Sequence, residues 1–143
     1  MPRMLVGTVR VEGVDHEDFS SNEHPTDKLR NIQIVLEPGQ PAQNLSIAPV
    51  KWGGECRVEV EVNATMLNDS SIKVAGNARF FEGASEETGE MEDQVSIDFT
   101  VPRTVGLTPP RHHHVSLRNR VLIGAEDSAE VFFDLSNLLL EED

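Results

Sequence analysis

Acidic side chains are concentrated in four segments of this sequence. Residues 13–27, 50–55, 83–93 and 124–128 hold thirteen aspartates and glutamates but only one basic residue, Lys51. Carboxylates that converge without counter-charges are unfavourable unless they are solvated, protonated or bridged by a cation. Ca²⁺ is a hard cation that prefers about six to eight oxygen ligands, so a calcium site is the chemistry that this pattern favours.

The expected ligands of such a site come from these four segments. They are Asp15, Asp18, Asp27, Glu87, Glu90, Asp93 and Asp127. The alternative is a set of solvated loops on an acidic protein, because runs of charge are usually exposed. The sequence has no EF-hand loop and no repeated Asp-x-Asp spacing. The segment 83–93 is also richer in glutamate than in aspartate, which has the shorter side chain.

A run of three histidines, His112 to His114, suggests a second metal hypothesis. Imidazoles at positions i and i+2 of a strand lie on one face and can bind Zn²⁺, although a complete site needs a third or fourth ligand. If the apolar phase of the following residues extends back, His113 points inward while His112 and His114 point outward. The alternative is an exposed polar start of a strand.

Nucleophilic catalysis has little support in the sequence. Cys56 lies in the apolar phase of an alternating segment, where a thiol behaves as a small hydrophobic group, so we expect it to be unreactive in the folded protein. We find no nucleophile elbow, metalloprotease helix, Walker loop or dinucleotide-binding glycine run. An enzyme that uses the clustered carboxylates remains an alternative.

Alternating apolar residues predict strands as the elements that position these groups. Residues 56–66 alternate without a break, and the same period of two recurs in 94–101 and 115–123. With glycine, proline, asparagine and aspartate as turn signals, the expected strands are 4–12, 28–37, 44–49, 56–66, 72–82, 94–101, 113–123 and 129–138. Because no segment has a helical period, we predict an all-β chain, an antiparallel β-sandwich of about eight strands. Its topology, C2-like or jelly-roll-like, is left open.

The chain is expected to form one domain, residues 1–138, followed by an acidic tail, 139–143. Consecutive antiparallel strands reverse direction, so the four acidic segments should share one end of the sandwich. In this one respect the arrangement resembles a C2 domain, which implies Ca²⁺ held between acidic loops at one end. Trp52 lies in one of these loops, and we expect it to fold back over the end of the core.

The strand phase also predicts which side chains are buried, and a shift by one residue would invert the pattern. The expected core residues are Val58, Val60, Val62, Ile97, Phe99, Leu117, Val121, Val131 and Phe133. The expected exposed residues are Glu59, Glu61, Asp98 and Arg118. Arg118 and Arg120 would pair across with the two glutamates if their strands are neighbours.

A weak internal repeat suggests a two-fold arrangement of the chain. Residues 7–13, Gly-Thr-Val-Arg-Val-Glu-Gly, resemble residues 76–83, Gly-Asn-Ala-Arg-Phe-Phe-Glu-Gly. Each copy precedes an acidic loop and would open a run of four strands. Chance similarity is the alternative.

The net charge of −13 argues against a nucleic acid or an anionic membrane as partner. No apolar run is long enough to span a bilayer, and residues 1–7 lack a signal-peptide core, so a soluble cytoplasmic protein is the default expectation. We expect a non-catalytic binding or assembly module whose acidic end takes calcium or a basic protein partner. The alternatives are an enzyme or enzyme accessory, or a structural subunit of an oligomer with contacts at Phe81, Phe132 and 138–140.

Overall fold

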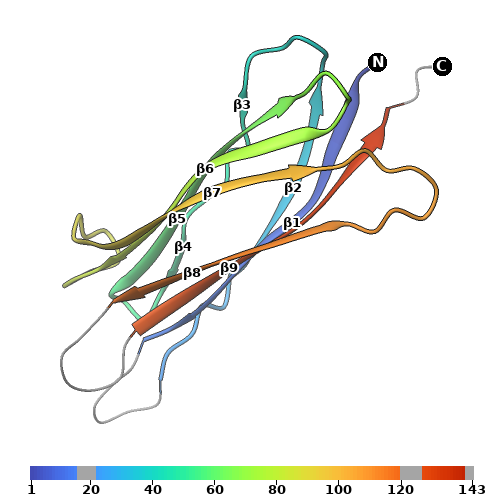
Figure 1. The fold of residues 1–143 in the computed structure, drawn as a ribbon. Helices are drawn as coiled ribbons and strands as arrows, with labels where there is room; N and C mark the ends of the chain where they lie inside the picture. The colour runs from blue at the N-terminus through green and yellow to red at the C-terminus, as the bar shows by residue number, and fades with distance from the viewer. Residues whose placement is uncertain (16–21, 120–126, 141–143) are drawn as a thin grey trace.

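Two antiparallel sheets make up the fold (Figure 1). A computed structural model describes residues 1–15, 22–119 and 127–140. Its strands are β1 (Arg3–Val14), β2 (Leu29–Leu36), β3 (Gln43–Asn44), β4 (Val50–Trp52), β5 (Cys56–Met66), β6 (Ile72–Glu82), β7 (Met91–Val101), β8 (Arg111–Asn119) and β9 (Asp127–Leu139). One sheet has the order β2-β1-β9-β8; the other has the order β3-β5-β6-β7, with β4 also paired to β5. The predicted all-β sandwich is therefore confirmed.

The core lies between the two sheets and follows the predicted phase. All the expected core residues that the structure describes are buried, and Val121 lies outside the described residues. Glu61, Asp98 and Arg118 are exposed, whereas Glu59 is half-buried. The period-two pattern therefore predicted correctly which face of β5, β7 and β9 is buried.

The strand predicted at 44–49 is wrong in its bounds. Gln43–Asn44 and Val50–Trp52 pair with β5, and Leu45 N–H donates to the Val62 carbonyl at 3.1 Å, but residues 46–49 leave the ladder. Ser46 has φ of +55°, and Pro49 has no N–H to donate to a ladder. The pairing also gains one residue, since Asn44 lies opposite Asn63 but Val50 lies opposite Val58. A long bulge therefore divides one strand into β3 and β4.

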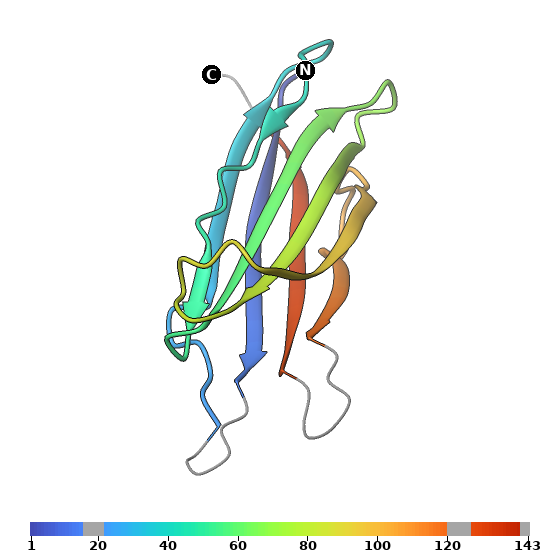
Figure 2. The same ribbon diagram turned by 90° about the vertical axis from the view of Figure 1, so that its left-hand side faces the viewer.

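The strand order matches the two-fold arrangement that the sequence repeat suggested. If β1, β2, β3 with β4, and β5 form one half of the chain, they correspond in order to β6, β7, β8 and β9. One sheet then reads β2-β1-β9-β8, and the other reads β7-β6-β5-β3 in the corresponding order. Each sheet thus combines strands from both halves of the chain, so strands that are distant in sequence lie side by side (Figure 2).

Gly7 and Gly76 occupy corresponding places in the two central strands. A Cβ atom on Gly7 would lie 1.9 Å from the carbonyl oxygen of Asp134, and one on Gly76 would lie 2.0 Å from that of Glu61. In both cases the carbonyl belongs to the residue before the glycine's ladder partner. The same close strand approach therefore requires glycine in each half.

The two lateral sides of the sandwich are closed in different ways. On one side the His113 ring stacks on Phe99 at 4.4 Å between centroids, which joins β8 to β7. On the other side the Arg30 guanidinium of β2 donates hydrogen bonds to the carbonyl oxygens of Ala48 (3.0 Å) and Pro49 (2.7 Å). Among the described residues, β2 pairs with β1 alone, so no strand pairs with its outer backbone edge.

Candidate functional site

The strand ends that border the acidic segments share one end of the sandwich, as strand parity predicted. The ends of β1, β4, β6 and β8 and the starts of β2, β5, β7 and β9 all lie toward the lower left in Figure 1. Trp52 folds back over this end of the core, as expected: only 3% of its surface is exposed, and its ring stacks on Phe80 at 5.9 Å. Its indole Nε1 has no hydrogen-bond partner among the described residues.

Three buried side chains converge beneath this end. One ligand atom each from Asp15, Cys56 and Asp127 lies within 4.8 Å of the other two. Asp15 is 1% exposed and Asp127 is 8% exposed, although aspartate is almost never this buried unless it is paired. Glu82 lies beside them, because its carboxylate oxygen Oε2 is 3.9 Å from the Cys56 sulfur. We call these four residues the end cluster.

Each residue of the end cluster is placed by the end of a strand. Cys56 begins β5 and lies opposite Glu82, which ends β6. Asp127 begins β9, and Asp15 follows β1 and pairs through its backbone with Glu23. Under the two-fold correspondence β1 matches β6 and β5 matches β9, so each half of the chain supplies two of the four side chains.

Crowding of these acids changes their protonation. Burial, and next a side-chain hydrogen bond with Asp127, raise the pKa of Glu82 from 4.5 to about 8. A proton on Glu82 at neutral pH lets its O–H donate to the Asp127 carboxylate. Burial, followed by the charges of Asp15 and Glu82, also raises the pKa of Cys56, which keeps the thiol protonated. The cluster can thus hold protons or, in their place, a cation.

Backbone packing leaves little space around Asp15. A Cβ atom on Gly53 would lie 2.4 Å from Asp15 Oδ2 and 2.8 Å from Glu23 Oε2. Gly53 has φ of +67°, a conformation that glycine adopts without strain. The turn between β4 and β5 therefore closes over two carboxylates, so Glu23 lies at the edge of the end cluster.

Two other residues of the predicted calcium site form ion pairs elsewhere. Asp27 pairs with Arg30 at 3.1 Å, and Glu87 pairs with Lys51 at 3.2 Å. The Asp27 and Glu87 side chains are largely exposed. These two carboxylates belong to the surface of the acidic end rather than to its interior.

The remaining predicted ligands are separate as well. Asp93 accepts a hydrogen bond from the Arg118 backbone N–H at 2.9 Å, and Glu90 is exposed beyond the end of β6. Asp18 lies outside the described residues. Among the described residues, only Asp15 and Asp127 of the expected set come together. Cys56 and Glu82 were missed, because their apolar phase and strand-end positions pointed to the core.

The histidine run forms cross-strand pairs. His112 contacts Asp134 and His114 contacts Glu130, each through a ring nitrogen and a carboxylate oxygen. The two pairs point to different carboxylates of β9, and His113 is half-buried against Phe99, as the strand phase predicted. Among the described residues, the histidines do not share a third ligand.

Neighbouring arginines cover the outward phenylalanines. His114 stacks on Phe132 at 4.5 Å, and the Arg10 guanidinium lies 4.6 Å from the centre of the same ring. Arg57 covers Phe81 at 4.3 Å in the same way. The contact surface that the sequence suggested at the two phenylalanines is therefore occupied within the chain.

The expected pairing of Arg118 with the glutamates of β5 is wrong. The β8 strand lies beside β9, so the Arg118 guanidinium pairs with Glu130, at 4.0 Å. Glu59 pairs with Arg57 at 2.9 Å. The strand that neighbours β8 could not be inferred from alternation, which carries no information on strand order.

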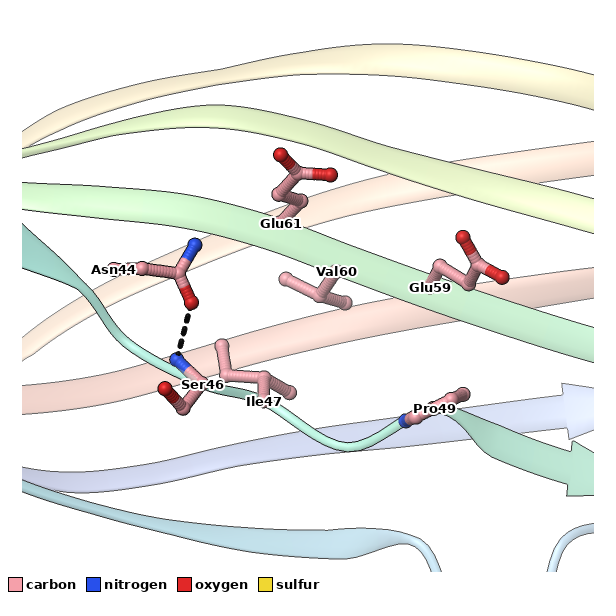
Figure 3. A pocket seen from close by; sticks show the side chains of 7 residues that line it. All are labelled: Asn44, Ser46, Ile47, Pro49, Glu59, Val60 and Glu61. Atoms are coloured by element: carbon pink, nitrogen blue, oxygen red, sulfur yellow. Dashed lines mark hydrogen bonds between the residues drawn. The ribbon is translucent and has the colours of Figure 1, made fainter.

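A surface pocket of about 310 Å³ lies where the bulge between β3 and β4 leaves β5 (Figure 3). Its lining includes Glu59 and Glu61, and the side-chain Oδ1 of Asn44 accepts a hydrogen bond from the Ser46 N–H. Both glutamates have arginine partners, Arg57 and Arg79. The pocket therefore has little net charge to attract a ligand.

The fold and the end cluster define an all-β sandwich with buried carboxylates and a thiol at one end. No family model matches the chain, and no curated protein or solved structure matches it significantly. The described residues include no helix that could cross a membrane.

Proposed function

We propose that this chain is a non-catalytic binding module whose acidic end coordinates a divalent metal ion in the end cluster. The observation that carries this proposal is the convergence of ligand atoms from Asp15, Cys56 and Asp127 within 4.8 Å, all of them buried. Glu82 is close enough to act as a fourth ligand, since its carboxylate contacts the same sulfur.

The ligand types argue for a borderline ion such as Zn²⁺ over Ca²⁺. Zn²⁺ accepts both thiolate and carboxylate ligands and prefers four of them, whereas Ca²⁺ takes about six to eight oxygens and avoids sulfur. A calcium site formed by the seven ligands predicted from the sequence would need Asp27 and Glu87 to leave their ion pairs with Arg30 and Lys51.

Protonation supplies a second argument. Glu82 has its pKa raised to about 8 and Cys56 also has a raised pKa, so both hold protons that a cation can replace. Binding would then release protons and become stronger as the pH rises. A divalent ion would also relieve the repulsion between Asp15 and Asp127.

The test is a set of thermal melts of metal-free protein in ZnCl₂, CaCl₂ and MgCl₂ at matched ionic strength. An ion bound only by the folded state stabilises it by about 2.7 kcal/mol at a hundred times its dissociation constant. We expect Zn²⁺ to raise Tm well beyond Ca²⁺ and Mg²⁺, and Asp127→Asn and Cys56→Ser to remove the difference. Glu87→Gln is the matched control, because it removes an exposed carboxylate from the same end.

Bound Co²⁺ gives an independent readout of the thiol. A sulfur-to-cobalt charge-transfer band should appear with the native protein and be absent from Cys56→Ser. Equal melts in the three salts would overturn the metal proposal and leave the acidic end as a surface for a basic protein partner.

A further inference from the structure

We propose that the edge of β2 pairs with the same edge of a second copy of this chain, which forms an antiparallel dimer through a continuous eight-stranded sheet. This proposal is independent of the metal site, which lies at the end of the sandwich and not at its side. It rests on four features of β2: the direction of its backbone groups, its lack of edge charges, its match to itself in one register, and the charges around it.

The first observation is the direction of the β2 backbone groups. Val11 N–H donates to Lys28 C=O at 2.9 Å, so the backbone of the even-numbered residues here faces β1. Two-residue alternation then directs the N–H and C=O groups of Leu29, Asn31, Gln33 and Val35 toward the outer edge. We call these four residues the β2 edge.

The second observation is that the β2 edge lacks the charges that protect the other long edges. Exposed edge strands usually carry charges, proline or a bulge that prevents pairing with another chain. Among the described strands, β7 has three acidic residues and β8 has two arginines and three histidines, while β3 and β4 are short and divided by a bulge. The only charged residue of β2 is Arg30, which is turned inward and paired with Asp27.

The third observation is that β2 matches itself in one antiparallel register. With Ile32 opposite Ile32 of the second copy, Leu29 lies opposite Val35, and Asn31 lies opposite Gln33. Leu29 is 50% exposed and Val35 is 42% exposed, so two exposed apolar side chains would cover each other at each end of the pair. The amide side chains would meet in the middle, where they can hydrogen-bond.

The fourth observation is electrostatic. The chain carries a net charge of −13, so most contacts between two copies would bring like charges together. Beside the β2 edge, the neighbouring residues of β1 are Met4, Val6, Thr8 and Arg10, of which only Arg10 is charged. The paired residues 29–35 therefore bring no acidic side chains together, and the nearest acids of opposite copies are Glu37 and Asp27 just beyond each end, where Asp27 pairs with Arg30. A basic partner would instead prefer the acidic end. These features therefore favour a second copy of this chain over a basic partner at the β2 edge.

Cross-linking by disulfides tests the register. Opposed residues that exchange hydrogen bonds have Cα atoms about 5.5 Å apart, within the range that a disulfide spans. A mixture of Leu29→Cys and Val35→Cys proteins should form a covalent heterodimer under mild oxidation, while neither variant alone should cross-link. The buried Cys56 does not interfere. A mixture of Leu29→Cys and Gln33→Cys is the control for the wrong register, and equal cross-linking in it would overturn the proposed pairing.

Substitution of the edge tests the dimer itself. Gln33→Pro removes an N–H that points outward and leaves the bonds to β1 intact, so it should convert the native dimer to a folded monomer in light scattering. Ser96→Pro is the matched control: Ser96 lies in the β7 edge strand, and it should leave the dimer intact. A native protein that is monomeric at millimolar concentration overturns the proposal, as does a Gln33→Pro protein that remains dimeric.

Charge exchange keeps the proposal testable if the proline variant does not fold. Asn31→Lys with Gln33→Lys brings lysines opposite one another and should raise the dissociation constant by about tenfold or more. Asn31→Glu with Gln33→Glu should have the same effect, and mixing the two variants should restore a heterodimer. The native dimer should also strengthen with NaCl, because salt screens the repulsion between two acidic chains. Mixing without recovery contradicts the register.

Discussion

The Cys56 thiol lies 3.9 Å from a carboxylate oxygen of Glu82, its partner across the β5–β6 ladder. The two side chains lie at the end of the sandwich, where Asp15 and Asp127 also enter from the other sheet. Burial of a thiol and three acids together disfavours full ionisation, and the raised pKa of Glu82 keeps a proton on this carboxyl at neutral pH.

The pH dependence of stability should report this constraint. Folding raises the pKa of Glu82 from 4.5 to about 8, so between these values the folded chain holds a proton that the unfolded chain has released. The free energy of unfolding should therefore fall as the pH rises through this window. Glu82→Gln keeps a neutral group at all pH values, so in EDTA its Tm should exceed that of the native chain by more at about pH 9 than at about pH 5. A constant difference would contradict the raised pKa, and Glu61→Gln, an exposed acid, is the control.

The reactivity of Cys56 should be very low in the native state. Its side chain is fully buried and its pKa is raised, so both access and thiolate formation are suppressed. A thiol reagent should label it at the rate of unfolding, and rapidly in denaturant. Fast labelling of the folded protein would show that the acidic end opens readily.

The close approach at Gly7 and Gly76 should make alanine costly at both positions. The new Cβ atoms would meet backbone carbonyls, which cannot move aside as a flexible side chain can. We expect each substitution to destabilise the chain by about 1–3 kcal/mol in denaturant unfolding. Gly89→Ala has no neighbour within 4 Å and serves as the control. A cost at Gly7 alone would argue against equivalent roles in the two halves.

Asn137 should be among the most sensitive polar residues. It is fully buried, accepts a hydrogen bond from Arg3 Nε at 2.7 Å, and donates to the carbonyls of Ser70 and Val101. Asn137→Ala leaves these groups without their partner and should cost about 2 kcal/mol or more by denaturant unfolding. Asn44→Ala removes an exposed amide and should cost much less.

The local pattern of the chain was enough to predict its strands and their buried faces. Val58, Val60 and Val62 alternate with polar residues, and a period of two permits only one choice of inward face. Strand parity then predicted that the acidic loops share one end, because antiparallel neighbours must reverse direction. The interruption at Ser46 and Pro49 was missed, since a bulge depends on pairing with β5 as well as on local composition.

The end cluster required the folded chain. Asp127 and Cys56 belong to different sheets, and their meeting depends on β9 pairing with β1 and β5 pairing with β6. Alternation shows which face of a strand is buried but not which strand lies beside or above it. The seven predicted calcium ligands therefore looked equivalent in the sequence. Among the described residues, the structure brings only Asp15 and Asp127 of this set together with Cys56 and Glu82. Composition thus indicated an acidic end, whereas strand order determined which of its carboxylates are buried side by side, because burial in a sandwich is a contact between residues distant in sequence.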